Sequence, residues 1–226
     1  MKLPRLRALK ALYSLARLVK DPSRLGEVFE IADALATPDA MQPMIDRLAQ
    51  DPVTARALEE RRRIRVDLAE LRRLPEGTFG RAFADQMIAA NLDPSALPHL
   101  ENDDDVAFFR GHLYETHDVW HAATGFGTDV AGELGLQAFY LAQIPGPLPS
   151  LLLGVGFLRS ALFDESLTVP MMEAIVQGWR MGKAARPLFG VRWDELWSVP
   201  VAEVRRQLGI DPADVAAASA VTGLAA

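Results

Sequence analysis

Apolar residues recur along this chain with a period close to that of an α-helix, and proline or glycine separates the segments that carry them. Helices are predicted over residues 2–20 and 23–36, and over 39–73 with a break at Asp51-Pro52. Further helices are predicted over 78–91, 103–124, 129–144, 167–185 and 193–208. The alternation typical of β-strands is almost absent, so the pattern predicts an all-α fold.

Length and composition favour a single-domain helical bundle. A chain of 226 residues, half of them hydrophobic, can bury a substantial core. We expect a basic amphipathic helix at 1–22, a helical core domain at 23–215 and a small-residue tail at 216–226. The most apolar run, at 151–158, is far shorter than the ~20 residues of a membrane-spanning helix, so no such helix is predicted.

Charge and cysteine content exclude several classes of protein. The net charge is −6, and no basic run interleaved with aromatic residues is present, which argues against a general nucleic-acid binder. The absence of cysteine removes disulfides, thiolate metal ligands and a cysteine nucleophile. The lack of cysteine fits a reducing cytosol, and residues 1–20 show no secretory signal, so we expect a cytoplasmic protein that associates peripherally with the inner membrane.

The N-terminal helix has two interpretations. Its basic side chains alternate with leucine, alanine and valine at helical spacing, which is typical of an amphipathic helix. Its apolar stripe could pack on the core while the charges face solvent. The helix could also lie on an anionic membrane surface, where each Lys or Arg contributes ~1 kcal/mol. Both can hold at once.

Two of the four histidines lie four residues apart in the segment Glu115-Thr-His-Asp-Val-Trp-His121. On a helix, His117 and His121 share one face, and Asp118 lies beside them. All three side chains can therefore point at one cation. Glu115 is a candidate to orient one of the imidazoles by a hydrogen bond, without binding the metal itself. It could equally well be an acid that faces solvent.

A predicted turn brings a fourth ligand to these residues. Gly125 and Gly127 can end the helix, and Thr128 or Asp129 can cap the next one. The antiparallel hairpin that results returns Glu133 to the depth of His121. Two imidazoles and two carboxylates suit zinc, iron or manganese better than calcium or an electron-transfer copper.

Other interpretations of the histidine pair remain open. A His-x-x-x-His pair on a helix often occurs by chance. Zinc proteases have the same spacing, but they need a glutamate where this chain has Asp118. Phosphohydrolases with a His-Asp doublet need further histidine and aspartate ligands, and only His99 and His112 are left to supply them.

The motif His117-Asp118-x-x-His121, eleven further residues and then Glu133 resembles the signature of the coenzyme Q (ubiquinone) biosynthesis family called Coq-four. The resemblance covers residues 10–225. It includes the segments Leu74-Pro-Glu-Gly-Thr-Phe-Gly80, Ala84-Asp-Gln-Met87, Trp193-Asp-Glu-Leu196 and Leu208-Gly-Ile210. His112-Leu-Tyr114 departs from the more basic run of the family, so no charge-binding role is carried over to it.

The resemblance implies a metal-dependent decarboxylase of ubiquinone biosynthesis. Its substrate would be a 3-polyprenyl-4-hydroxybenzoate-type intermediate that loses the carboxyl group from C1, with hydroxylation at that carbon as a further step to consider. The metal would be held by His117, Asp118, His121 and Glu133. Zinc is the first candidate, and iron, manganese and magnesium are the others. An oxidative reaction needs an electron acceptor, which zinc cannot be.

A polyprenyl substrate also needs an apolar channel and a site for its carboxylate. The channel could be lined by apolar residues that follow the predicted metal site, namely Phe139, Leu151, Leu152, Gly154, Gly156 and Phe157. If the carboxylate lies beyond the reach of the metal, Lys183 and Arg186 are the first cations to test.

The alternative function is a non-catalytic one. The chain would be a lipid-binding scaffold that organises the coenzyme Q synthetic complex, with a closed shell of four protein ligands around the ion. The resemblance to the family also implies peripheral association with the inner membrane, contact with other coenzyme Q biosynthesis proteins and a homodimer.

Overall fold

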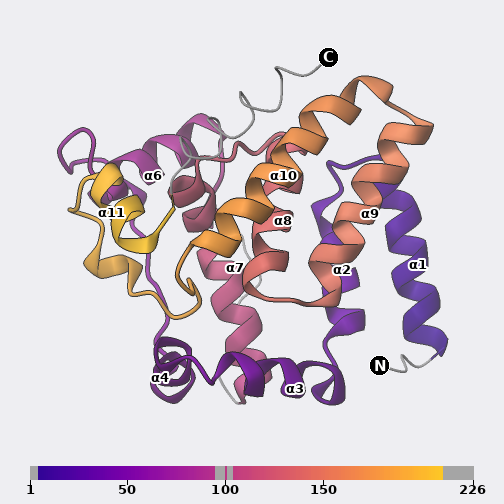
Figure 1. Ribbon diagram of the computed structural model, residues 1–226, viewed down its shortest axis with the longest axis horizontal. Helices are drawn as coiled ribbons and strands as arrows, with labels where there is room; N and C mark the ends of the chain where they lie inside the picture. The colour runs from indigo at the N-terminus through magenta and orange to yellow at the C-terminus, as the bar shows by residue number, and fades with distance from the viewer. Residues whose placement is uncertain (1–4, 95–99, 101–103, 211–226) are drawn as a thin grey trace. The chain divides into compact units, whose positions relative to one another are not determined.

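The described part of the chain is built of α-helices and short 3-10 turns, with one isolated β-bridge between Thr78 and Pro200 (Figure 1). This structure is a computed structural model, and it describes residues 5–94, 100 and 104–210. The all-α prediction is confirmed. No helix in the described ranges is both long and apolar enough to span a membrane.

The chain divides into two compact units, each made of two separate stretches of sequence. One unit comprises Met1–Arg47 and Asp129–Lys183, and the other comprises Leu48–Thr128 and Ala184–Ala226. The predicted boundary at residue 22 follows the end of the first helix. The predicted tail at 216–226 lies outside the described residues.

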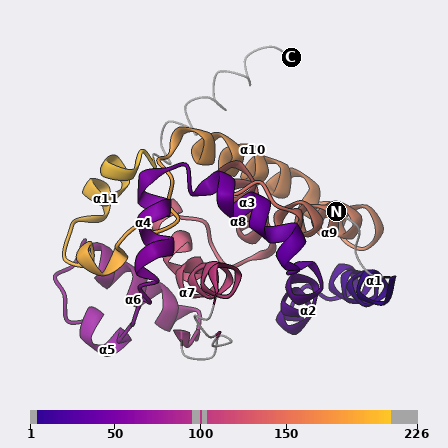
Figure 2. The same ribbon diagram turned by 90° about the horizontal axis from the view of Figure 1, so that it is seen from below.

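The first unit packs its N-terminal helices against a helix from the middle of the chain. Its helices are α1 (Arg5–Lys20), α2 (Leu25–Leu35), α3 (Pro38–Leu48), α8 (Val130–Gln143), α9 (Pro147–Leu162) and α10 (Thr168–Ala184). The helices α1, α2 and α9 lie side by side (Figures 1 and 2). Their shared core contains Leu18, Val19, Ile31, Leu35, Leu152 and Val155.

The helix α1 packs on the core, as the first of its two interpretations predicted, and association with a membrane surface stays a prediction. It buries Leu18 and Val19 against α2 and α9. The apolar side chains of Leu6, Leu9 and Tyr13 are exposed on the same helix. An amphipathic helix that packs on the core and still presents apolar side chains to solvent can do both.

Glycine allows unusually close helix packing in the first unit. A Cβ atom at Gly178 of α10 would overlap the carbonyl oxygen of Gly135 in α8. One turn later, a Cβ at Gly182 would lie 2.8 Å from the carbonyl oxygen of Phe139. Both obstacles on α8 are backbone atoms, which cannot rotate away as a side chain can.

The second unit surrounds α7 (Asp105–Thr124) with shorter helices, and α4 packs against it (Figure 2). The others are α4 (Pro52–Glu60), α5 (Leu68–Leu71), α6 (Phe79–Ala89) and α11 (Val201–Leu208). Phe79 stacks on the rings of Trp193 and Trp197. The backbone N–H of Phe79 donates to the carbonyl of Val199 at 2.8 Å. Two of the segments quoted for the family resemblance are thus joined in one aromatic core.

The helix predicted over 39–73 is interrupted more than the sequence indicated. Residues 61–67 are not helical, and Arg61 ends α4 in the left-handed conformation with φ of 45°. The next two arginines pair with acids far away in sequence, Arg62 with Asp194 and Arg63 with Glu115. Local helical periodicity cannot report such partners, so the sequence pattern predicted that the helix continues through residues 61–67.

Candidate metal centre

The helix that carries both histidines begins and ends where the sequence predicts. Asp104 is its N-cap, and its carboxylate accepts from the N–H of Ala107 at 2.8 Å. The helix ends at Thr124, and Gly125 follows with φ of 84°. The N–H of Gly125 donates to the carbonyl of His121 at 2.8 Å, which closes the last turn. Asp129 then caps α8 through the N–H groups of Ala131 and Gly132.

His121 is held in an orientation that suits a metal ligand. Its side chain is only 1% exposed, and Nδ1 lies 3.1 Å from the carbonyl oxygen of Phe126. A carbonyl can only accept, so Nδ1 must carry the proton and Nε2 must hold the lone pair. Metal-binding histidines commonly have this arrangement, with the second ring nitrogen bonded to a carbonyl or carboxylate.

Two further side chains gather beside His121. The ring of His117 lies perpendicular to it, with 4.9 Å between the ring centroids. His117, His121 and Glu133 each offer one ligand atom, and these atoms all lie within 4.8 Å of one another. The hairpin spacing therefore brings together three of the four predicted ligands. Asp118 is not part of this group, and its role as a ligand stays a prediction.

An arginine distant in sequence holds the end of α7. The Nε of Arg205 donates to the carbonyl of Ala123 at 2.8 Å, and Nη2 reaches the carbonyl of Ala122 at 3.4 Å. A guanidinium at this position satisfies carbonyls that a helix C-terminus leaves without partners, and it complements the helix dipole. Local sequence patterns cannot predict this contact, because 82 residues separate Arg205 from Ala123.

Comparison with known proteins identifies the family of this chain. Residues 4–214 match the family model described as "Coenzyme Q (ubiquinone) biosynthesis protein Coq4". The chain belongs to the Coq4 family.

Relatives of the Coq4 family are similar along most of the chain. A mitochondrial ubiquinone biosynthesis protein coq4 of Aspergillus fumigatus is 30% identical over 197 residues, which are 84% of this chain and 68% of that protein. The mitochondrial COQ4 homolog of Rattus norvegicus is 31% identical over 172 residues, 74% of this chain and 64% of that one. A crystal structure of a ubiquinone biosynthesis protein from Nostoc punctiforme is 32% identical with a TM-score of 0.78. It covers 89% of this chain and 97% of its own.

Glu115 binds a neighbouring segment. Its carboxylate accepts from Nε of Arg63 at 2.7 Å and from the N–H of Ile64 at 3.4 Å. Both members of the ion pair are partly buried. These contacts hold the non-helical segment 61–67 against α7, while a role for Glu115 in orienting an imidazole stays a prediction.

Replacing Glu115 with alanine separates the two roles. The variant leaves Arg63 partly buried without its carboxylate, so we expect the free energy of unfolding to fall by about 2 kcal/mol. Urea unfolding measures this loss. If Glu115 also orients a histidine, the folded variant will bind metal at least about tenfold more weakly than the wild type. Unchanged metal affinity assigns Glu115 to the fold alone.

The residues predicted for the channel and for the substrate carboxylate differ in their exposure to solvent. Lys183 and Arg186 are exposed. Among the channel residues, Phe139 and Leu152 are buried and Phe157 is exposed. The space left by Gly156 is filled by the side chain of Leu134, whereas a Cβ at Gly154 would meet nothing within 4 Å. These roles stay predictions.

His112 lies on α7 but not in the metal group. Burial lowers the pKa of its imidazole from 6.5 to about 4, with a smaller effect from the charge of Arg63. The ring is therefore neutral in the folded chain at pH 7. Since the folded pKa is below the unfolded one, its contribution to stability is complete above pH 6.5 and is lost as the pH falls toward 4.

We expect acid to weaken the wild type more than a His112→Phe variant. Between pH 7 and pH 4.5, the free energy of unfolding should fall by roughly 2 to 3 kcal/mol more in the wild type. Urea titrations at both pH values give the difference, in which the shared contribution of other groups cancels. Parallel losses in the two proteins would show that His112 is not buried as a neutral ring.

Proposed function

We propose that this chain catalyses metal-dependent loss of the carboxyl group from C1 of a polyprenylated 4-hydroxybenzoate-type intermediate in ubiquinone biosynthesis. The observation that carries the proposal is the cluster of His117, His121 and Glu133. Membership of the Coq4 family supports the pathway, and the cluster supports the chemistry.

The donor atoms of the cluster fit a divalent cation. Two imidazoles and one carboxylate are typical of catalytic zinc sites, in which a further position stays open. Nε2 of His121 would be the nitrogen that binds the metal, since Nδ1 donates to the carbonyl of Phe126. Iron, manganese and magnesium are the alternative cations, and Asp118 is the proposed further ligand or outer partner. A bound cation of this kind supplies Lewis acidity that withdraws electron density from a substrate carboxylate or phenolate.

The surrounding residues would protect and orient the reacting group. Trp120 and His121 are almost fully buried, and Phe126 is buried beside them. Low accessibility keeps bulk water from the site and strengthens electrostatic interactions there. Arg205 would act indirectly, because its bonds to the carbonyls of Ala122 and Ala123 hold the turn that presents the carbonyl of Phe126.

A membrane surface would supply the polyprenyl substrate. The exposed leucines and Tyr13 of α1 are accompanied by the basic side chains of Arg7 and Lys10. Such a helix can insert apolar side chains between lipid headgroups while its cations attract anionic lipid. We propose peripheral association with the inner membrane through this helix, an apolar channel for the prenyl tail, a homodimer and contact with other coenzyme Q biosynthesis proteins.

The test of the reaction follows the fate of the carboxyl carbon. Metal-loaded protein on anionic vesicles is incubated with 3-polyprenyl-4-hydroxybenzoate labelled with ¹³C in its carboxyl group. We expect labelled carbon dioxide and an aromatic product that lacks the label, with parallel incubations under air and under argon to show whether oxygen is consumed. If labelled carbon dioxide is released no faster than in vesicles without protein, the proposed decarboxylase activity is overturned.

A lipid-binding scaffold is the second candidate, and exposed apolar side chains favour it. Besides α1, the helices α9 and α10 and the turn between them leave large apolar side chains exposed, namely Phe157, Leu158, Leu162, Phe163, Val169, Met172, Val176 and Trp179. Such side chains are typical of surfaces that meet lipid or another protein. A scaffold would still bind vesicles and partners after loss of the metal, whereas a decarboxylase would lose turnover.

A further inference from the structure

The helix α10 has apolar side chains on two of its faces. One face is buried and packs on α8, where Gly178 allows the close approach. The other face is open to solvent, and its large side chains are between 38% and 65% exposed. These side chains, which we call the α10 stripe, are Val169, Met172, Val176 and Trp179. An amphipathic helix needs one apolar face to pack on its own core, so a second one indicates a surface that binds a partner.

The α10 stripe has the spacing of a coiled-coil seam. Its residues follow one another at intervals of three, four and three, as the a and d positions of a heptad repeat do. The same spacing continues by one position at each end, to Glu165 before the stripe and to Lys183 after it. A seam of this kind is the surface through which two helices pack side by side.

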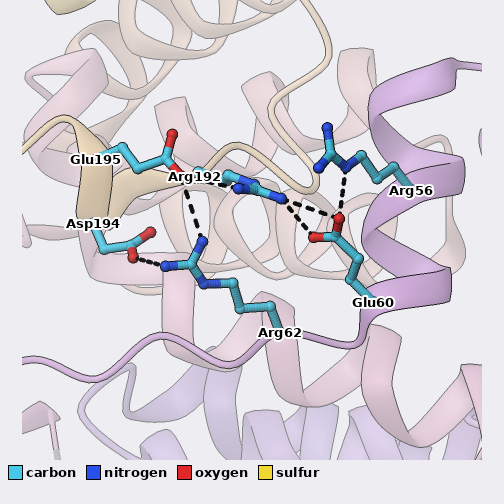
Figure 3. Close-up of polar contacts among 6 residues, drawn as sticks. All are labelled: Arg56, Glu60, Arg62, Arg192, Asp194 and Glu195. Carbon is cyan, nitrogen blue, oxygen red and sulfur yellow. Dashed lines mark hydrogen bonds and ion pairs between the residues drawn. The ribbon is translucent and has the colours of Figure 1, made fainter.

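Surface charges of the second unit form a paired network. Figure 3 shows Arg192 between Glu60 and Glu195, with bonds of 2.7 and 3.0 Å. The Nε of Arg56 donates to the same Glu60 at 2.6 Å. Each exposed pair adds little to stability, but the network leaves these charges matched within the chain.

The charges at the two ends of the α10 stripe are not matched in this way. Glu165 and Lys183 are exposed, and neither makes an ion pair or a side-chain hydrogen bond with another described residue. The stripe therefore begins with a negative charge and ends with a positive one. Glu173 and Arg180 lie on the flank of the stripe and can stay in solvent.

The exposed apolar area suits a protein partner. The end of α9 and the residue after it add Leu158, Leu162 and Phe163, each more than half exposed. Large side chains carry roughly 150 to 250 Å² each, so these residues and the α10 stripe together expose on the order of 700 Å². Each partner in a standard protein interface contributes about 800 Å².

We propose that the α10 stripe binds the same stripe of a second copy of the chain, with the two helices antiparallel about a two-fold axis. The axis passes near Ala174, the midpoint of the stripe. It places Val169 opposite Trp179 of the second copy, and Met172 opposite Val176. A larger side chain then faces a smaller one at every level, which favours close packing.

The end charges select both the partner and its direction. The two-fold axis places Glu165 of each copy opposite Lys183 of the other, whereas a parallel pair would bring like charges together. An anionic bilayer would attract one end of the stripe and repel the other, so the charges favour a second copy over lipid. This inference rests on the homodimer proposed above and assigns its interface. No residue of the metal group takes part.

Sedimentation equilibrium of the full chain at low ionic strength tests the interface. The wild type should be a dimer in equilibrium with the monomer. Met172→Glu places a charge within the seam and should raise the dissociation constant of the dimer at least about tenfold. Glu59→Arg changes charge at an exposed position of α4 and should leave the constant unchanged. A wild type that stays monomeric at every concentration overturns the proposal.

Charge reversal tests the antiparallel arrangement. Glu165→Lys and Lys183→Glu should each weaken the dimer at least about tenfold, because the two-fold axis repeats each repulsion. An equimolar mixture of the two variants should recover the wild-type affinity, since the mixed dimer has opposite charges at both ends. If the mixture associates as weakly as each variant alone, the antiparallel arrangement is wrong.

Two further outcomes would assign the surface differently. If Met172→Glu dimerises as tightly as the wild type, the dimer forms through another surface, so this interface fails while the homodimer stands. If the variant keeps its self-association but no longer binds vesicles of phosphatidylcholine and phosphatidylglycerol, the stripe meets lipid, which also overturns the proposal. Circular dichroism and thermal melting show that each variant is folded.

Discussion

His121→Ala is expected to lose at least about 99% of decarboxylation turnover while it keeps its fold. The substitution removes an imidazole whose orientation is fixed by the carbonyl of Phe126 at 3.1 Å. The cluster would then retain only His117 and Glu133, too few to hold a divalent cation firmly. Labelled carbon dioxide release measures turnover, and circular dichroism and thermal melting show whether the fold persists.

A matched substitution controls for general damage. Glu133→Gln should lose turnover as His121→Ala does, because an amide is a poor replacement for a carboxylate ligand. Glu173→Gln makes the same chemical change at an exposed position of α10 and should retain full turnover. If His121→Ala folds and still turns over substrate at the wild-type rate, the proposal that the reaction depends on this metal centre is wrong.

Gly178→Ala is expected to cause the largest loss of stability. A methyl group at this position overlaps the carbonyl oxygen of Gly135, so α8 and α10 must move apart. We expect the free energy of unfolding to fall by about 3 kcal/mol, which is a drop of roughly 10 °C in the melting temperature.

The control for Gly178→Ala is another glycine within a helix. Gly154→Ala adds the same methyl group to α9, where a Cβ meets nothing within 4 Å. Alanine is the better helix former, so this variant should be neutral or more stable by up to about 1 kcal/mol. Similar melting temperatures for the two variants would show that α8 and α10 do not pack closely at Gly178.

Local patterns predicted the hairpin well. That His117 and His121 share one face depends on the helical period alone. Gly125 and Asp129 are local signals for the end of one helix and the start of the next. With both boundaries fixed, the position of Glu133 followed from helix rise. The same helical geometry placed Asp118 beside the two histidines, and its role as a ligand stays a prediction because the cluster is formed by His117, His121 and Glu133.

Contacts between distant segments could not be predicted in this way. The charged run at 59–63 is compatible with a solvated helix face, yet Arg63 binds Glu115 across 52 residues. Arg205 reaches the end of α7 from a helix near the C-terminal end of the described residues. Glycine at 178 also gave no signal, because close packing is visible only when α8 and α10 are placed together.

The amount of metal per chain tests the proposed centre most directly. Protein purified without chelators is dialysed, and its zinc, iron, manganese and magnesium are measured by inductively coupled plasma mass spectrometry. We predict about one divalent cation per chain in the wild type and in Glu173→Gln, and less than about a tenth of that in His121→Ala and Glu133→Gln. A folded wild type that binds no cation, or equal metal in all four proteins, would contradict the metal centre formed by His117, His121 and Glu133.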